Sequence, residues 1–106
     1  MEINDITYAI NGAIFEVNKV LGPGFLEKVY ENALLYELKN RGLKAVCQAP
    51  ITVNYKGQCV GEYVADILVE DSVIIELNVP SYRVEAAKQT KSGGQPPKGS
   101  KQKSTS

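Results

Sequence analysis

Two acidic residues interrupt the most apolar segments of the chain, where carboxylates are uncommon. Asp66 lies within VADILV (residues 64–69) and Glu76 within VIIELNV (residues 73–79). If residues 70–72 form a turn, the two side chains fall opposite or nearly opposite each other, and like charges at such positions destabilise a sheet. Either one carboxyl group is protonated or a cation lies between them. The alternative for Asp66 is a structural role, as a strand-end residue bonded to a nearby amide.

A divalent ion held by Asp66, Glu76 and a strand carbonyl would resolve this repulsion. Magnesium suits such a site because it is bound through one or two carboxylates and keeps several waters for a substrate. The chain has no histidine, which excludes Ser-His-Asp and Cys-His mechanisms and leaves oxygen ligands for a hard metal. Cys47 and Cys59 lack the pattern of a zinc site, so we interpret both as core or strand residues.

Glu27 is the third acidic candidate. At about 100° per residue it lies between Leu34 and Leu38 on the helical wheel, and it therefore points along the core-facing stripe of its helix. We expect it near the same ion if the helix packs on that face of the sheet. The alternative is that Gly24 caps the helix and that Glu27, as the third helical residue, is favoured there by the helix dipole and the free amides.

These side chains must be positioned by two helices and a sheet, which makes the fold class α+β. Apolar residues recur at three-and-four spacing in two stretches, which predicts two helices over residues 5–21 and 25–41. Alternating or continuously apolar stretches then predict an antiparallel meander of three or four strands, over residues 51–55, 59–69 and 73–79. Lys56-Gly57 is the expected turn of the first hairpin. Residues 84–91 are expected to form a short helix.

The 106-residue chain divides by charge near residue 80. Residues 1–80 carry six Lys and Arg against eleven Asp and Glu, a net charge of −5, whereas residues 81–106 carry six against one, a net charge of +5. Residues 93–106 contain no large apolar residue, so we expect a disordered basic tail. The sequence shows no signal-peptide pattern and no apolar run long enough to span a membrane, so a cytoplasmic protein is expected.

The segment GFLEKVY (residues 24–30) carries a G-x-x-E-x-x-Y pattern formed by Gly24, Glu27 and Tyr30. With its surroundings, LGPGFLEKVYENAL, and with VGEYVADILVEDSVIIELN further on, it resembles the GxxExxY protein family of the PD-(D/E)xK nuclease superfamily. The resemblance covers about residues 3–79. It implies a nuclease-like core of helices and a sheet with a phosphodiesterase site that depends on magnesium or manganese and acts on nucleic acid.

Carried over by position, the resemblance implies that Glu27 is the helix acid and that Asp66 and Glu76 are the first and second metal ligands. Leu77 would contribute a strand carbonyl. The family's lysine falls on Asn78, which can donate a hydrogen bond but carries no charge. Since such a lysine positions the attacking water and stabilises charge on the phosphoryl group, the resemblance implies metal binding with weak or no cleavage.

The resemblance ends, on this interpretation, after residue 79, which suggests a truncated, frameshifted or divergent nuclease-like core over residues 1–80. Residues 81–92 would then be a short helix or linker, and the strand over residues 73–79 would be left at or near a sheet edge and promote self-association. The alternative function is a nonspecific nucleic-acid-binding or oligomerising module with a vestigial site. Its phosphate contacts would come from the basic residues near the end of the chain, which are Arg83, Lys88, Lys91, Lys98, Lys101 and Lys103.

Overall fold

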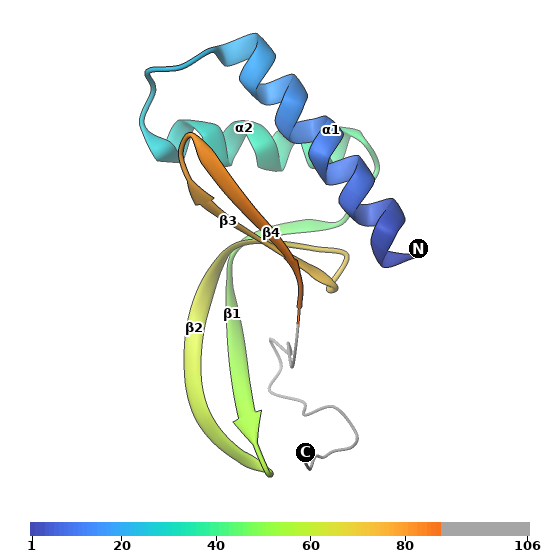
Figure 1. The fold of residues 1–106 in the computed structure, drawn as a ribbon, viewed down its shortest axis with the longest axis vertical. Helices are drawn as coiled ribbons and strands as arrows, with labels where there is room; N and C mark the ends of the chain where they lie inside the picture. The colour runs from blue at the N-terminus through green and yellow to red at the C-terminus, as the bar shows by residue number, and fades with distance from the viewer. Residues whose placement is uncertain (88–106) are drawn as a thin grey trace.

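Two helices pack on one face of a four-stranded antiparallel sheet in the structure, a computed structural model that describes residues 1–87 (Figure 1). This confirms the predicted α+β class. The helices are α1 (Ile3–Leu21) and α2 (Glu27–Asn40), and the strands are β1 (Ala45–Tyr55), β2 (Gln58–Val69), β3 (Val73–Asn78) and β4 (Ser81–Ala86). No helix within the described residues is both long and apolar enough to cross a membrane.

Both helices form because their apolar residues fall on one stripe. The stripe of α1 buries Ile6, Ile10, Ala13 and Val17, and that of α2 buries Tyr30, Leu34 and Leu38. The start of α2 differs from the prediction: Leu26 is the N-cap residue and Glu27 the first helical residue. The interpretation of Gly24 as the N-cap is therefore wrong, because Gly24 has a φ of 109° and belongs to the connecting loop.

The strands follow one another across the sheet in the order β1-β2-β3-β4. Lys56 and Gly57 connect β1 to β2, and both have positive φ values, of 52° and 83°, as a two-residue type I′ turn requires. The predicted hairpin turn is thus confirmed. Residues 70–72 connect β2 to β3 as predicted, and Val69 pairs with Val73 on either side of them.

The β1–β2 hairpin is much longer than the part of it that pairs with the rest of the sheet. β1 and β2 pair from Ala45↔Val69 to Tyr55↔Gln58, but β2 pairs with β3 only through the residues from Ile67 to Val69. The far half of the hairpin therefore extends away from the helices (Figure 1). Cys47 and Cys59 lie on β1 and β2 as free thiols, which confirms their interpretation as strand residues.

The segment after Pro80 is a strand. The prediction of a short helix over residues 84–91 is therefore wrong for the described part of that range, residues 84–87. β4 pairs with β3 from Asn78↔Ser81 to Val73↔Ala86. The reason is the alternation of the half-buried Tyr82 and Val84 with exposed polar neighbours, which matches the period of a strand. Residues 88–91 and the expected disordered tail, residues 93–106, lie outside the described residues.

β3 is therefore an interior strand next to the edge strand β4, so it lies near the edge of the sheet, as expected, but does not form it. Within residues 1–87 the edge strands are β1 and β4. The helix-facing side of β2 and β3 joins the main core through Ile67, Val69, Val73, Ile75 and Leu77. A second, smaller apolar cluster contains Ala49, Ile51, Ala65, Leu68 and Ile74.

Candidate metal centre

β2 and β3 separate at the point where the acidic residues occur. The last residue pair of their ladder is Ile67↔Ile75. Beyond it, the Leu77 amide donates a 2.7 Å hydrogen bond to Oδ2 of Asp66, in place of a β2 carbonyl. The structural role that we gave as the alternative for Asp66 is thus present. A carboxylate has several lone pairs, so this bond leaves capacity for a cation.

Asp66 and Glu76 project from the sheet face that lies away from the helices. Side chains alternate along a strand, and Ile67, Ile75 and Leu77 all belong to the helix-facing core. Asp66 and Glu76 therefore share the other face, on adjacent antiparallel strands, as predicted. Both are half-buried.

The environment of Glu76 is consistent with the repulsion expected between these two carboxyl groups. Partial burial raises the pKa of Glu76, and the negative charge of Asp66 raises it further. Arg83 on β4 and a backbone hydrogen bond from Asp66 lower it, whereas a side-chain hydrogen bond with Asp66 raises it. Two carboxyl groups can share a hydrogen bond only while one holds a proton, so the pair resists carrying two charges.

Glu27 reaches the end of β3 from the helical layer. Its Oε2 lies 3.4 Å from the amide nitrogen of Val79, two residues beyond the amide that Asp66 binds. Amides two residues apart point to the same side of a strand, so both carboxylates bond to one side of this segment. Within residues 1–87, however, no three acidic, histidine or cysteine side chains are grouped closely enough for one ion. Glu27 is exposed at the first position of α2, so the prediction that it points along the core-facing stripe is wrong, and it stands apart from the Asp66 and Glu76 pair.

The local geometry of residues 22–30 explains how Glu27 is positioned. The Tyr30 hydroxyl donates a 2.6 Å hydrogen bond to the Gly22 carbonyl and accepts a 3.2 Å bond from the Phe25 amide. Tyr30 itself is only 2% exposed, so it anchors the loop to the core. Gly24 supplies a positive φ that other residues adopt at a cost. Together these contacts determine where α2 begins, and so where Glu27 lies.

The carbonyl of Leu77 is directed to the side of β3 on which Asp66 lies. In an antiparallel strand, the N–H and C=O groups of one residue point to the same neighbouring strand. Because the Leu77 amide bonds to Asp66, its carbonyl also points toward β2. Two carboxylates and a carbonyl form an all-oxygen set of the kind that Mg²⁺ or Mn²⁺ prefers, and a cation there would remove the conflict between Asp66 and Glu76.

Asn78 and Arg83 lie beside this pair. Asn78 is exposed at the end of β3, and a hollow of about 240 Å³ is lined by Glu76, Asn78, Ser81, Tyr82 and Arg83. Arg83 is the residue directly opposite Glu76 in the β3–β4 ladder. Arg83 was expected only as one of the basic residues near the end of the chain. The two-residue alternation of residues 82–85 is the signal that would have placed it on a strand.

A second polar pair links α2 to β1. Gln48 of β1 has a φ of 52°, and its amide donates a 2.9 Å hydrogen bond to Oε2 of Glu31. Glu31 is 6% exposed, and Lys28 lies 3.7 Å from the same oxygen. The buried carboxylate of Glu31 is thus satisfied by neighbours within α2 and β1. It provides a structural link between the helix and the sheet.

Comparison with known proteins agrees with this arrangement. The family model of the PD-(D/E)XK nuclease superfamily matches residues 4–91. Searches of curated proteins and of solved structures found no match. The match extends through β4, so the expectation that the resemblance ends after residue 79 is wrong. Since it covers most of the 106 residues, the chain belongs to the PD-(D/E)XK nuclease superfamily.

Proposed function

We propose that this chain is a nuclease-like protein of the GxxExxY type that binds a magnesium or manganese ion through Asp66 and Glu76. Membership of the superfamily supports nucleic acid as the partner and a phosphodiester as the substrate class. The observation that carries the proposal is the placement of Asp66 and Glu76 on one face of neighbouring strands. Burial raises the pKa of Glu76 there and the negative charge of Asp66 raises it further, which is a charge conflict between the two carboxyl groups. A divalent ion would relieve it.

Each residue of the proposed site has a distinct role. Asp66 is the principal metal ligand, and its bond to the Leu77 amide holds it in orientation. Glu76 is the second ligand, and the Leu77 carbonyl completes the set. When bound, the metal ion supplies a water of lowered pKa and stabilises charge on a phosphoryl oxygen. Glu27 is the helix acid, and its contact with the Val79 amide holds the end of β3 beside the site.

Asn78 limits the cleavage that this site can perform. Its amide can donate one hydrogen bond to a water or a phosphate oxygen, but it cannot balance negative charge. Loss of one such electrostatic stabiliser commonly costs on the order of a hundredfold in rate. We therefore infer metal binding with weak phosphodiester hydrolysis.

Calorimetric titration of the full chain with Mg²⁺ and with Mn²⁺ tests the proposal. We expect wild type to bind either ion, and Asp66→Asn, which keeps the size of the side chain, to lose at least about tenfold in affinity. Asp71→Asn is the matched control, because Asp71 is an exposed turn residue paired with Lys44. Equal metal affinity in wild type and Asp66→Asn, with both variants folded by circular dichroism, would overturn the proposal.

The uneven charge of the chain favours a second candidate, which is nonspecific binding to nucleic acid or self-association. Residues 81–106 carry the net charge of +5, although all of their lysines lie outside the described residues. Self-association would use the edge of β4, since β3 is covered by it. Light scattering at increasing concentration tests this part. The two unpaired thiols favour the reducing cytoplasm as the location.

A further inference from the structure

We propose that Arg83 binds a phosphate group of the substrate beside Glu76, and so supplies from β4 the positive charge that position 78 lacks. This inference rests on the proposed function, because it assigns the substrate contact within the same site. It adds a residue from a strand that comes after the two metal ligands in the chain.

The strand register places Arg83 next to the metal ligands. Glu76 and Arg83 are direct partners across β3 and β4, where Cβ atoms lie about 5 Å apart on one face. The neighbours of Arg83 in β4, Tyr82 and Val84, pack against the helix-facing core. Arg83 therefore projects from the opposite face, which also carries Asp66 and Glu76.

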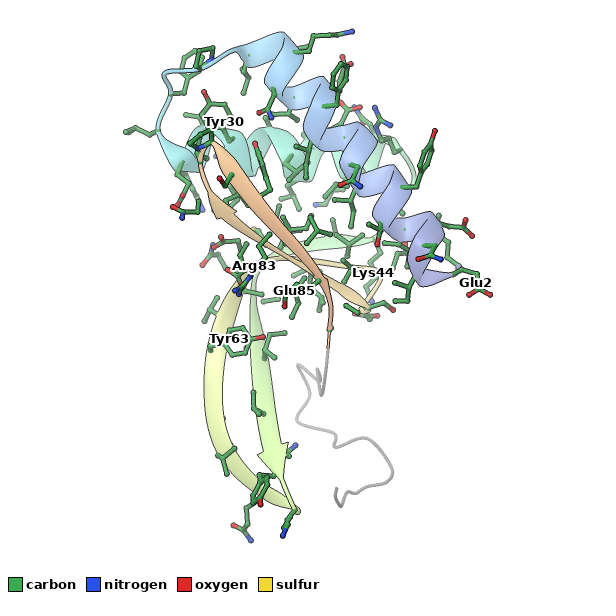
Figure 2. All side chains as sticks on the ribbon, viewed as in Figure 1. Glu2, Tyr30, Lys44, Tyr63, Arg83 and Glu85 are labelled. Carbon is green, nitrogen blue, oxygen red and sulfur yellow. The ribbon has the colours of Figure 1, made fainter. Side chains whose placement is uncertain are left out.

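Two hollows meet at the Glu76 and Arg83 pair, since these two residues line both. One hollow, of about 240 Å³, extends toward Asn78 and Ser81. The other, of about 260 Å³, extends toward Glu85 and Tyr63. Figure 2 shows Arg83 and Glu85 close together, with Tyr63 of β2 beside them. Each hollow is smaller than the sites of whole drug-sized ligands and suits one phosphate group with part of its sugar.

The guanidinium of Arg83 is available for such a ligand. Its side chain is 68% exposed, and its ion pair within residues 1–87 is a 3.4 Å contact from Nε to Oε2 of Glu85. Exposed ion pairs of this kind are weak, whereas a guanidinium matches the geometry of a phosphate with two parallel hydrogen bonds. Once a metal ion balances Asp66 and Glu76, the positive charge of Arg83 is free to bind the phosphate.

Binding of a fluorescein-labelled, short single-stranded DNA oligonucleotide in magnesium, followed by anisotropy, tests the inference on the full chain. We expect Arg83→Gln to weaken binding about tenfold and to reduce the slope of log affinity against log salt by about 0.7. Arg83→Lys should recover part of the affinity, because it keeps the charge but not the paired geometry. Glu85→Gln, which removes the competing carboxylate, should bind at least as tightly as wild type.

The matched control is Arg41→Gln, since Arg41 lies at the end of α2 and pairs with Glu37 at 2.8 Å. A loss in Arg41→Gln equal to that in Arg83→Gln would overturn the inference, because it would show a general charge effect. Unchanged DNA affinity in Arg83→Gln, with magnesium binding intact by calorimetry, would overturn the role of Arg83 alone. Absence of magnesium binding in wild type would overturn the proposed function and, with it, the place of Arg83 in that site.

Discussion

At the scale of single residues, the pair of Asp66 and Glu76 is an electrostatic conflict that the fold maintains. Their strands bring the carboxyl groups together, and the Leu77 amide relieves only part of the charge of Asp66. Perturbed carboxyl groups of this kind cluster at functional sites, where a cation or a substrate balances their charge. The conflict has measurable consequences for pH dependence and for catalysis.

The raised pKa of Glu76 predicts that stability falls as pH rises in the absence of metal. The folded state holds the Glu76 proton more tightly than the unfolded state does. The stabilisation from this bound proton is complete below the ordinary pKa of 4.5, and it is lost as the pH rises through the raised pKa. Glu76→Gln should therefore become more stable than wild type as pH rises, by less than about 1 kcal/mol because the side chain is only half-buried.

Urea denaturation in a chelator, at pH values on both sides of 4.5, measures this difference. Glu62→Gln is the control, since Glu62 is an exposed glutamate of the same sheet. Added magnesium should stabilise wild type more than Glu76→Gln. A difference between these two proteins that does not depend on pH would contradict the prediction.

A lysine at position 78 should increase cleavage. Asn78→Lys places an ammonium on the same strand face as Glu76, where it can hold a water and a phosphate oxygen, and we expect nicking of plasmid DNA in magnesium to rise by up to about a hundredfold. The increase should vanish in the double variant with Asp66→Ala. Equal nicking by wild type and Asn78→Lys would refute the role assigned to position 78.

At the scale of elements, the loop between α1 and α2 determines the position of Glu27. The loop is held by backbone bonds to one buried side chain, Tyr30, and not by a side-chain cap on the helix. The spacing between Gly24 and Tyr30 is thus explained by loop geometry. Of the three motif residues, Glu27 is the one for which we propose a chemical role.

Removal of the Tyr30 hydroxyl should destabilise the protein. Tyr30→Phe leaves the Gly22 carbonyl and the Phe25 amide without their partner, which costs about 1–2 kcal/mol. Urea denaturation measures the change. Tyr36→Phe is the matched control on the same helix, because Tyr36 is 69% exposed, and it should be neutral. Equal stability of the two variants would show that the loop does not depend on Tyr30.

At the scale of the whole molecule, opposite charges are separated along the chain. The part that holds the carboxylates is acidic, and nucleic acid would be repelled from it without a metal ion or basic residues nearby. Arg83 lies near this boundary in the sequence, on β4. We therefore expect the proposed metal binding and the proposed phosphate binding to be separable by mutation.

Neutralising the five lysines beyond β4 tests whether metal binding and DNA binding are separate. With Lys88, Lys91, Lys98, Lys101 and Lys103 changed to Gln, we expect DNA affinity to fall uniformly across sequences. The salt slope should fall by about 0.7 for each lysine that contacts a phosphate of a single strand. Anisotropy at several salt concentrations measures both. Magnesium affinity by calorimetry should stay unchanged, and its loss would contradict a separate metal site.

The features that the sequence by itself determined are those set by short spacings. The stripes of α1 and α2 follow from apolar residues three and four apart, and the Lys56-Gly57 turn follows from its own backbone preferences. The juxtaposition of Asp66 and Glu76 could also be predicted, because a short turn between two strands sets their register. In each case the determining residues lie within a few positions of one another.

Only the tertiary structure decided the features that depend on residues far apart in the chain. Glu27 faces the core stripe on a helical wheel, but packing of α2 on the helix-facing side of the sheet separates it from Glu76. Residues 84–86 can form a helix or a strand in isolation, and pairing with β3 selects the strand. That choice places Arg83 opposite Glu76, because the register of two strands is a property of their contact and not of either sequence alone.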